Sequence, residues 1–71
     1  MSAYDYFYRI IVTEKNPDNY IKIIETLGDK SIRGEEVDAY IVSTTQKDIK
    51  KLSFDWITKI EPYDSYVQAI F

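Results

Sequence analysis

One stretch decides the fold class: NPDNYIKIIETLG, which runs from Asn16 to Gly28. Its first residues are typical of a helix start, because Asn16 can cap free backbone N–H groups and Pro17 suits the first helical position. Apolar residues then recur at the three- and four-residue spacing of one helix face: Tyr20, Ile23, Ile24 and Leu27. Gly28 stands where helices commonly end on a positive φ angle. The stretch therefore predicts one amphipathic helix with both ends marked.

A strand is predicted just before this helix. Residues 6–13 are aromatic or β-branched apart from Arg9, which is a strand composition. A period of two places these residues on two faces: Tyr6, Tyr8, Ile10 and Val12 on one, Phe7, Arg9, Ile11 and Thr13 on the other. Both faces carry apolar side chains, whereas a strand with one wet face shows a cleaner alternation.

Three further strands and a second helix are predicted after Gly28. We expect a short strand over residues 29–33, a turn at residues 34–36 and a third strand over residues 37–44. Residues 45–48 resemble a capping box, and the spacing of Ile49, Leu52 and Trp56 predicts a helix from about Gln46 toward Phe54. Residues 57–62 read as the fourth strand, with Pro62 at its end or at a sheet edge.

The resulting order, β-α-β-β-α-β, predicts an α+β fold of the ferredoxin-like kind. In that plan two helices cover one face of a four-stranded antiparallel sheet, and residues 1–71 form a single domain. The other face has no helix to cover it. One face or the other of the first and third strands offers Phe7, Ile11, Tyr40 and Val42, so apolar residues are expected on the uncovered face. An apolar patch of that kind often marks an interface, although Arg9, Asp38 and Lys59 could equally break it up.

Composition excludes several functions. The chain has no histidine and no cysteine, so it lacks the commonest general base, the commonest metal ligand and any disulfide. We therefore expect no enzyme activity, no metal and no cofactor. A net charge of −3 and a third strand that is neither basic nor glycine-rich argue against nucleic-acid binding.

No membrane association is expected from the sequence. No apolar run is long enough to span a bilayer, and residues 1–5 do not resemble a signal peptide. A cytoplasmic location is expected if the chain is a complete gene product, and the sequence leaves the compartment otherwise unknown.

The C-terminal residues are unusually apolar. Residues 65–71 carry no charge, and the chain closes on Gln68, Ala69, Ile70 and Phe71. Chain ends are normally frayed and solvated. An apolar end is therefore either packed at a sheet edge of its own domain or offered to a partner.

The second half of the chain resembles the propeptides of subtilisin-type proteases and the free-standing inhibitors related to them. The resemblance is carried by Ile49-Lys50-Lys51-Leu52, by residues 57–62 with the sequence ITKIEP, by Asp64, and by the Tyr66-Val67 pair. Residues 6–13 also resemble the first strand of that family.

The resemblance implies a partner and a binding mode. It implies that the chain binds and inhibits a subtilisin-like serine protease, or assists its folding as an intramolecular chaperone, with the uncovered sheet face on the enzyme. It also implies that Glu61 caps the N-terminus of a protease helix. Asp64 would cap a second helix, but Tyr63 displaces it by one position from the family pattern. The final residues would lie like a cleavage product in the active-site cleft, with Phe71 in the primary pocket and Ile70, Ala69 and Gln68 in the preceding subsites.

A second interpretation belongs to a different class of protein. A ferredoxin-like regulatory or interaction domain without a protease role could use the same uncovered face to form a homodimer. The two interpretations differ at the C-terminal residues, which the first leaves free of the domain and the second packs against it.

Overall fold

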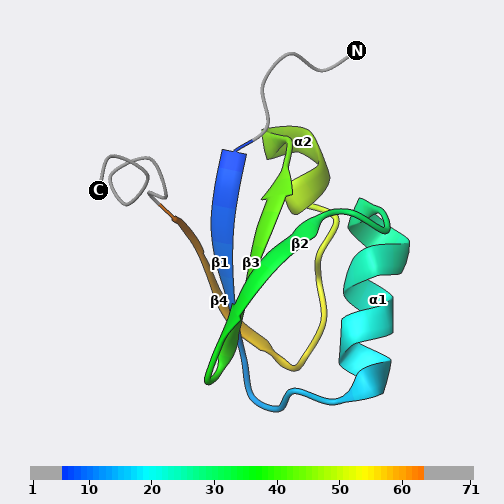
Figure 1. Cartoon of the computed structure of the whole chain (residues 1–71), viewed down its shortest axis with the longest axis vertical. Helices are drawn as coiled ribbons and strands as arrows, with labels where there is room; N and C mark the ends of the chain where they lie inside the picture. Colours follow the sequence, from blue (N-terminus) through cyan, green and yellow to red (C-terminus); the bar gives the residue numbers. More distant parts are fainter. Residues whose placement is uncertain (1–5, 64–71) are drawn as a thin grey trace.

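The computed structural model describes residues 6–63, which form four strands and two helices (Figure 1). The elements in chain order are β1 (Tyr6–Val12), α1 (Pro17–Leu27), β2 (Ile32–Glu36), β3 (Ala39–Thr44), α2 (Gln46–Ile49) and β4 (Ile57–Pro62). The α+β class and the order of elements agree with the prediction from sequence.

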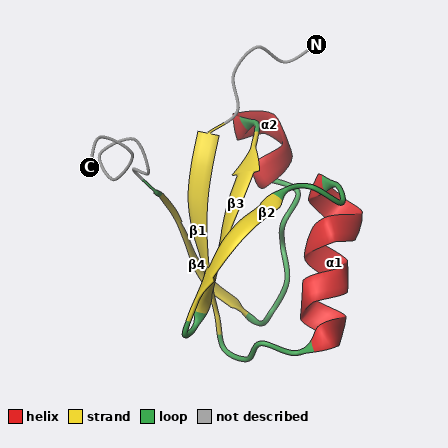
Figure 2. Cartoon of the chain, viewed as in Figure 1, coloured by secondary structure: helices red, strands yellow, loops and turns green. Residues whose placement is uncertain are grey.

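The four strands form one antiparallel sheet in the order β2-β3-β1-β4 (Figure 2). β1 is central and pairs with β3 on one side and with β4 on the other. The register places Ile10 opposite Tyr40 and also opposite Ile60, so these three side chains share one face. β2 and β4 are the two edges of the sheet.

Helix α1 forms for the reasons that its sequence suggests. The Asn16 Oδ1 accepts a hydrogen bond of 2.8 Å from the Asn19 N–H, which satisfies one of the unpaired donors of the first turn. Pro17 occupies the first turn, as predicted. Gly28 ends the helix with a φ of 113° and donates its N–H to the Ile24 carbonyl at 2.7 Å. A positive φ is accessible to glycine without a steric penalty.

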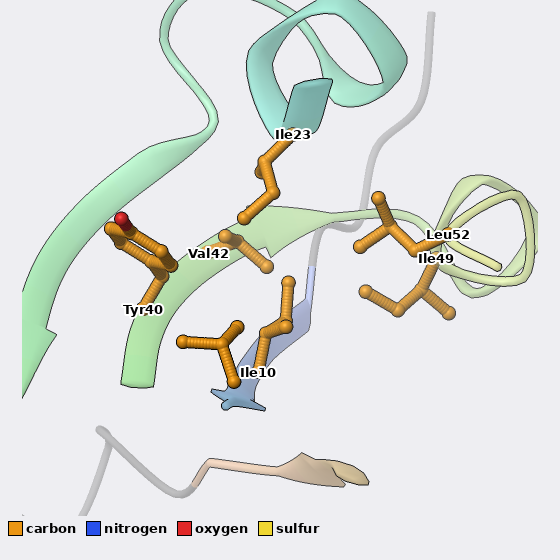
Figure 3. Close-up of a cluster of buried hydrophobic side chains, with 7 residues drawn as sticks. Ile10, Ile23, Tyr40, Val42, Ile49 and Leu52 are labelled. Carbon is orange, nitrogen blue, oxygen red and sulfur yellow. The ribbon is translucent and has the colours of Figure 1, made fainter. Parts of the chain in front are cut away.

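The hydrophobic core lies between the sheet and the two helices (Figure 3). Its fully buried members come from three elements, with Ile10 on β1, Ile23 on α1 and Val42 on β3. Ile49 of α2 and Leu52 just after it close one end of the same cluster. Both helices thus contribute to a single core on one face of the sheet.

The β2–β3 hairpin lies further along the chain than predicted. The turn is formed by Val37 and Asp38, and residues 34–36 belong to β2. Gly34 therefore does not make the turn. It lies opposite Ile41 in the sheet, at a register shift that begins at Ile32. Glycine within a strand often marks such a bulge, and the sequence pattern alone did not separate that role from a turn.

Helix α2 is shorter than predicted. The Thr45 hydroxyl caps its start by accepting a hydrogen bond from the Asp48 N–H at 3.0 Å, but the helix ends at Ile49. After Lys50, two backbone N–H groups bond to carbonyls three residues earlier, Lys51 to Asp48 and Leu52 to Ile49. This tighter winding turns the chain away while it still delivers Leu52 to the core. The apolar spacing was correct for burial but not for helix length.

Candidate functional site

We call the sheet surface opposite the core the open face. Alternation along the paired strands places ten side-chain positions on it: Phe7, Arg9, Ile11, Gly34, Glu36, Ala39, Ile41, Ser43, Lys59 and Glu61. Within residues 6–63, no helix packs on this face, since α1 and α2 both contribute to the core on the other. The open face is therefore the sheet surface on which a partner could dock.

Arg9 forms the centre of the open face. Its Nη1 donates a hydrogen bond of 2.9 Å to Glu61 Oε2 on β4. On the other side, its Nη2 donates to Glu36 Oε2 at 3.2 Å, and its Nε lies 2.8 Å from Glu36 Oε1, at ion-pair distance but outside hydrogen-bond geometry. The guanidinium also lies 5.0 Å from the centroid of the Tyr63 ring. One side chain thus connects three strands of the sheet.

The length of the Arg9 side chain helps to explain why two apolar residues of the open face are buried. Glu36 lies on β2, so the Arg9 side chain must cross β3 to meet it. Ala39 and Ile41 lie on β3 beneath that path and are 0% and 7% exposed. The aliphatic part of an arginine side chain can cover apolar surface while its charged end stays in contact with polar groups.

The apolar residues of the open face differ from the set that the sequence suggested. Of the four candidates, Tyr40 and Val42 point into the core. Phe7 and Ile11 lie on the open face and are partly buried. With Ala39 and Ile41 of β3, the face combines four apolar side chains with a charged centre, because the register that buries Tyr40 and Val42 turns Arg9 outward.

Glu61 is held in its charged form. Arg9 donates a hydrogen bond to one carboxylate oxygen, and Lys59 Nζ lies 3.3 Å from the other. These contacts, with the Arg9 hydrogen bond the larger, lower the pKa of the Glu61 carboxyl below its usual value. The same hydrogen bond raises the pKa of Arg9. Each carboxylate oxygen has a second lone pair, so Glu61 keeps the capacity to accept hydrogen bonds from a partner.

A shallow hollow adjoins the open face where β1 begins and β4 ends. It is lined by Tyr6, Phe7, Tyr8, Gln46, Pro62 and Tyr63. Most of these side chains are aromatic, and Tyr63 is the last residue that the structure describes. The hollow thus lies beside the point from which the C-terminal residues continue.

A second charged cluster lies on the opposite side of the sheet. Lys15 Nζ is 2.8 Å from Glu35 Oε1 and 5.0 Å from the centroid of the Tyr40 ring. Burial raises the pKa of the Tyr40 hydroxyl, while the charge of Lys15 acts against that rise. The cluster ties the loop before α1 to the hairpin, which is a structural role.

The structure places one of the six predicted site residues. Glu61 lies on the open face, on β4 opposite Arg9. The other five, Asp64, Gln68, Ala69, Ile70 and Phe71, lie outside the described residues. Sequence reasoning missed Arg9 and Glu36 as partners of this site. The one signal for Arg9 was its position as the only charge within an otherwise apolar strand.

Comparison with protein-family models, with curated proteins and with solved structures gave no match. Residues 6–63 contain no group of three or more His, Cys, Asp or Glu side chains suited to a metal ion. In the same part of the chain, no helix is long and apolar enough to cross a membrane.

Proposed function

We propose that this chain is a propeptide-like protein that binds a subtilisin-like serine protease and inhibits it or assists its folding. The open face docks on the enzyme surface, and residues 68–71 lie in the active-site cleft as a cleavage product would. The domain has no catalytic role of its own. We also propose that it is a variant of the ferredoxin-like plan with a shortened second helix; read from its other edge, the sheet order is β4-β1-β3-β2.

The observation that carries this proposal is the composition of the open face. Phe7, Ile11 and Glu61 lie on one surface that neither helix covers. Two apolar side chains can bury area against a partner, and a carboxylate beside them suits a helix N-terminus, where unpaired N–H groups and the helix dipole favour a negative charge. β4 also ends beside this surface, so the C-terminal segment starts from its rim.

Binding to an inactive subtilisin tests the proposal directly. The enzyme would carry alanine at its catalytic serine, so that the chain is bound but not cleaved. We expect Ile11→Glu to weaken binding at least roughly tenfold, because it replaces an apolar side chain of the interface with a charged one that must be desolvated on docking. Ile21→Glu is the matched control, because Ile21 is 45% exposed on α1, away from the open face. Equal binding by the two variants would contradict docking through the open face.

The same samples separate the protease interpretation from a homodimer. Sedimentation of the purified chain should show a monomer whose molar mass does not depend on concentration. A stable dimer that Ile11→Glu dissociates, together with no binding to the protease, would instead assign the open face to self-association.

A further inference from the structure

Glu61 has two cationic neighbours, which differ in their distance from its carboxylate and in their exposure to solvent. Lys59 belongs to the same strand, and its side chain is 64% exposed at a distance of 3.3 Å. Arg9 comes from the adjacent strand, is 32% exposed and donates at 2.9 Å. A short hydrogen bond from a planar guanidinium fixes a carboxylate better than a mobile ammonium group does. Arg9 is thus the partner that sets where the Glu61 carboxylate points.

Arg9 is itself held on its far side. Glu36 meets the guanidinium at Nε and Nη2, and the Tyr63 ring lies 5.0 Å from its centre. The carboxylate, the guanidinium and the second carboxylate therefore form a line across the sheet whose middle member is restrained at both ends. Such a restraint removes rotamer freedom from Glu61 before any partner arrives.

We infer that Arg9 is a positioning residue of the protease-binding surface: it aims the Glu61 carboxylate away from the sheet so that a helix N-terminus of the protease can donate hydrogen bonds to it. This inference rests on the proposed function and adds to it the residue through which Glu61 acts. Arg9 works through Glu61 and is not required to touch the protease.

The charges of this cluster suit burial in an interface. Arg9 and Lys59 balance Glu36 and Glu61, so the four groups sum to zero. Burial of an unpaired charge is strongly unfavourable, whereas burial of paired and hydrogen-bonded charges is much less so. Removal of Arg9 would leave two carboxylates and one exposed lysine on the docking surface.

The pH dependence of binding distinguishes positioning from simple packing. Four charged or titratable groups surround Glu61 on the open face. Arg9 of β1 and Lys59 of β4 contact it directly, while Glu36 and Tyr63 contact Arg9. Both helices lie on the other side of the sheet. While Arg9 is present, its hydrogen bond keeps the pKa of the Glu61 carboxyl below the usual value. Without Arg9, Glu61 takes up a proton at higher pH and loses the negative charge that favours hydrogen bonds from a helix N-terminus.

The test measures the dissociation constant of the full chain with the catalytic-serine-to-alanine subtilisin from about pH 4 to about pH 8. We expect Arg9→Met, which keeps an unbranched apolar stem, to weaken binding roughly tenfold near neutral pH. We also expect its acid loss of binding to begin at higher pH than that of the wild type. Comparison with the wild type cancels the pH dependence that belongs to the protease itself.

Lys51→Met is the matched control. Lys51 also forms an ion pair with a carboxylate, that of Asp48 at 3.1 Å, but it follows α2 on the helix side of the sheet and contacts neither Arg9 nor its partners. Its loss should leave the dissociation constant and its pH profile unchanged. Circular dichroism shows whether each variant is folded. Arg9→Lys is a milder change, and we expect its dissociation constant to lie between those of the wild type and Arg9→Met.

A double-mutant cycle completes the test. In the Glu61→Gln background, Arg9→Met should weaken binding by a smaller factor than in the wild type, because the carboxylate that it positions is gone and only Glu36 loses its partner. A wild-type pH profile in Arg9→Met or Arg9→Lys, or additive effects of Arg9→Met and Glu61→Gln, would overturn the positioning role while leaving protease binding intact. Failure of the wild-type chain to bind at all would instead remove the proposed function and this inference with it.

Discussion

Arg9 and Glu61 are 52 positions apart in the chain, yet the Arg9 Nη1 donates a hydrogen bond to Glu61 Oε2 at 2.9 Å. The pair joins β1 to β4 and lies on the open face, which neither α1 nor α2 covers. The proposed binding surface therefore depends on the fold, because β1 and β4 must be correctly paired before the two side chains can form a hydrogen bond.

Stability at acid pH should depend on Glu61. Its pKa is lowered in the folded chain, so the ionised form contributes stability above the usual carboxyl pKa of about 4.3, and that contribution is lost as the pH falls through the lower folded value. We expect Glu61→Gln to lower stability at neutral pH and to flatten its decline in acid. Urea denaturation at a series of pH values measures both effects. A variant that loses stability in acid as steeply as the wild type would show that other groups control the decline.

Truncation of Ile23 should destabilise the domain, whereas truncation of Ile21, on the other side of α1, should not. Ile23 is 0% exposed and belongs to the core cluster, whereas Ile21 is 45% exposed. We expect Ile23→Ala to reduce the free energy of unfolding by about 2–5 kcal/mol. Ile21→Ala should change it by less than about 0.5 kcal/mol. Urea midpoints of the two variants give this contrast, and similar losses would mean that α1 does not face the sheet as described.

The start of α1 should depend on the side-chain oxygen of Asn16. Replacement by alanine removes the acceptor for the Asn19 N–H and should cost about 1 kcal/mol. Asn16→Asp keeps an oxygen in that place and adds a negative charge at the helix N-terminus, so it should be neutral or slightly stabilising. Thermal unfolding followed by circular dichroism compares the two. An equal loss in both variants would assign the effect to something other than capping.

Loss of the C-terminal residues should affect binding and not folding. We expect deletion of residues 68–71, and separately Phe71→Asp, to weaken protease binding strongly, because the primary pocket of a subtilisin-like enzyme would be left empty or would receive a charge. The thermal midpoint should stay within a few degrees of the wild type, since a change below about 1 kcal/mol moves it by only that much in a domain of this size. A large fall in the midpoint after deletion would show that these residues pack on their own domain, as the homodimer interpretation expects.

Local signals in the sequence predicted most of the fold. The helix from Pro17 to Leu27 carried its cap, its apolar stripe and its terminal glycine in the sequence, and β4 was placed at residues 57–62, where the structure has it. Both rest on short-range chemistry. The prediction of four antiparallel strands and two helices in one α+β domain followed from the order of such signals.

Features that depend on long-range pairing were placed less well. Gly34 reads as a turn residue in isolation, but its strand is fixed by pairing with Ile41, which only the folded sheet supplies. The length of α2 was overestimated because Leu52 can reach the core from a tighter turn as well as from a helix. The identity of the open face depended on register, which periodicity alone leaves undetermined.

In the candidate site, too, local signals could be recognised in the sequence but long-range contacts could not. Glu61 could be named from a local motif near the end of the last strand. Its bond to Arg9 and the continuation to Glu36 could not, because these residues come from three strands that meet only in the sheet. A single arginine in an apolar strand is a useful signal for such a cluster, but it does not identify the partners.

Titration of an active subtilisin with the purified chain, followed by mass spectrometry of the mixture, tests the central claim most directly. We expect protease activity to fall in proportion to added chain and to reach its minimum near one chain per enzyme molecule, with the intact chain ending at Phe71 still present. Full protease activity in a large molar excess of the chain, together with rapid digestion of the chain, would contradict the proposed function.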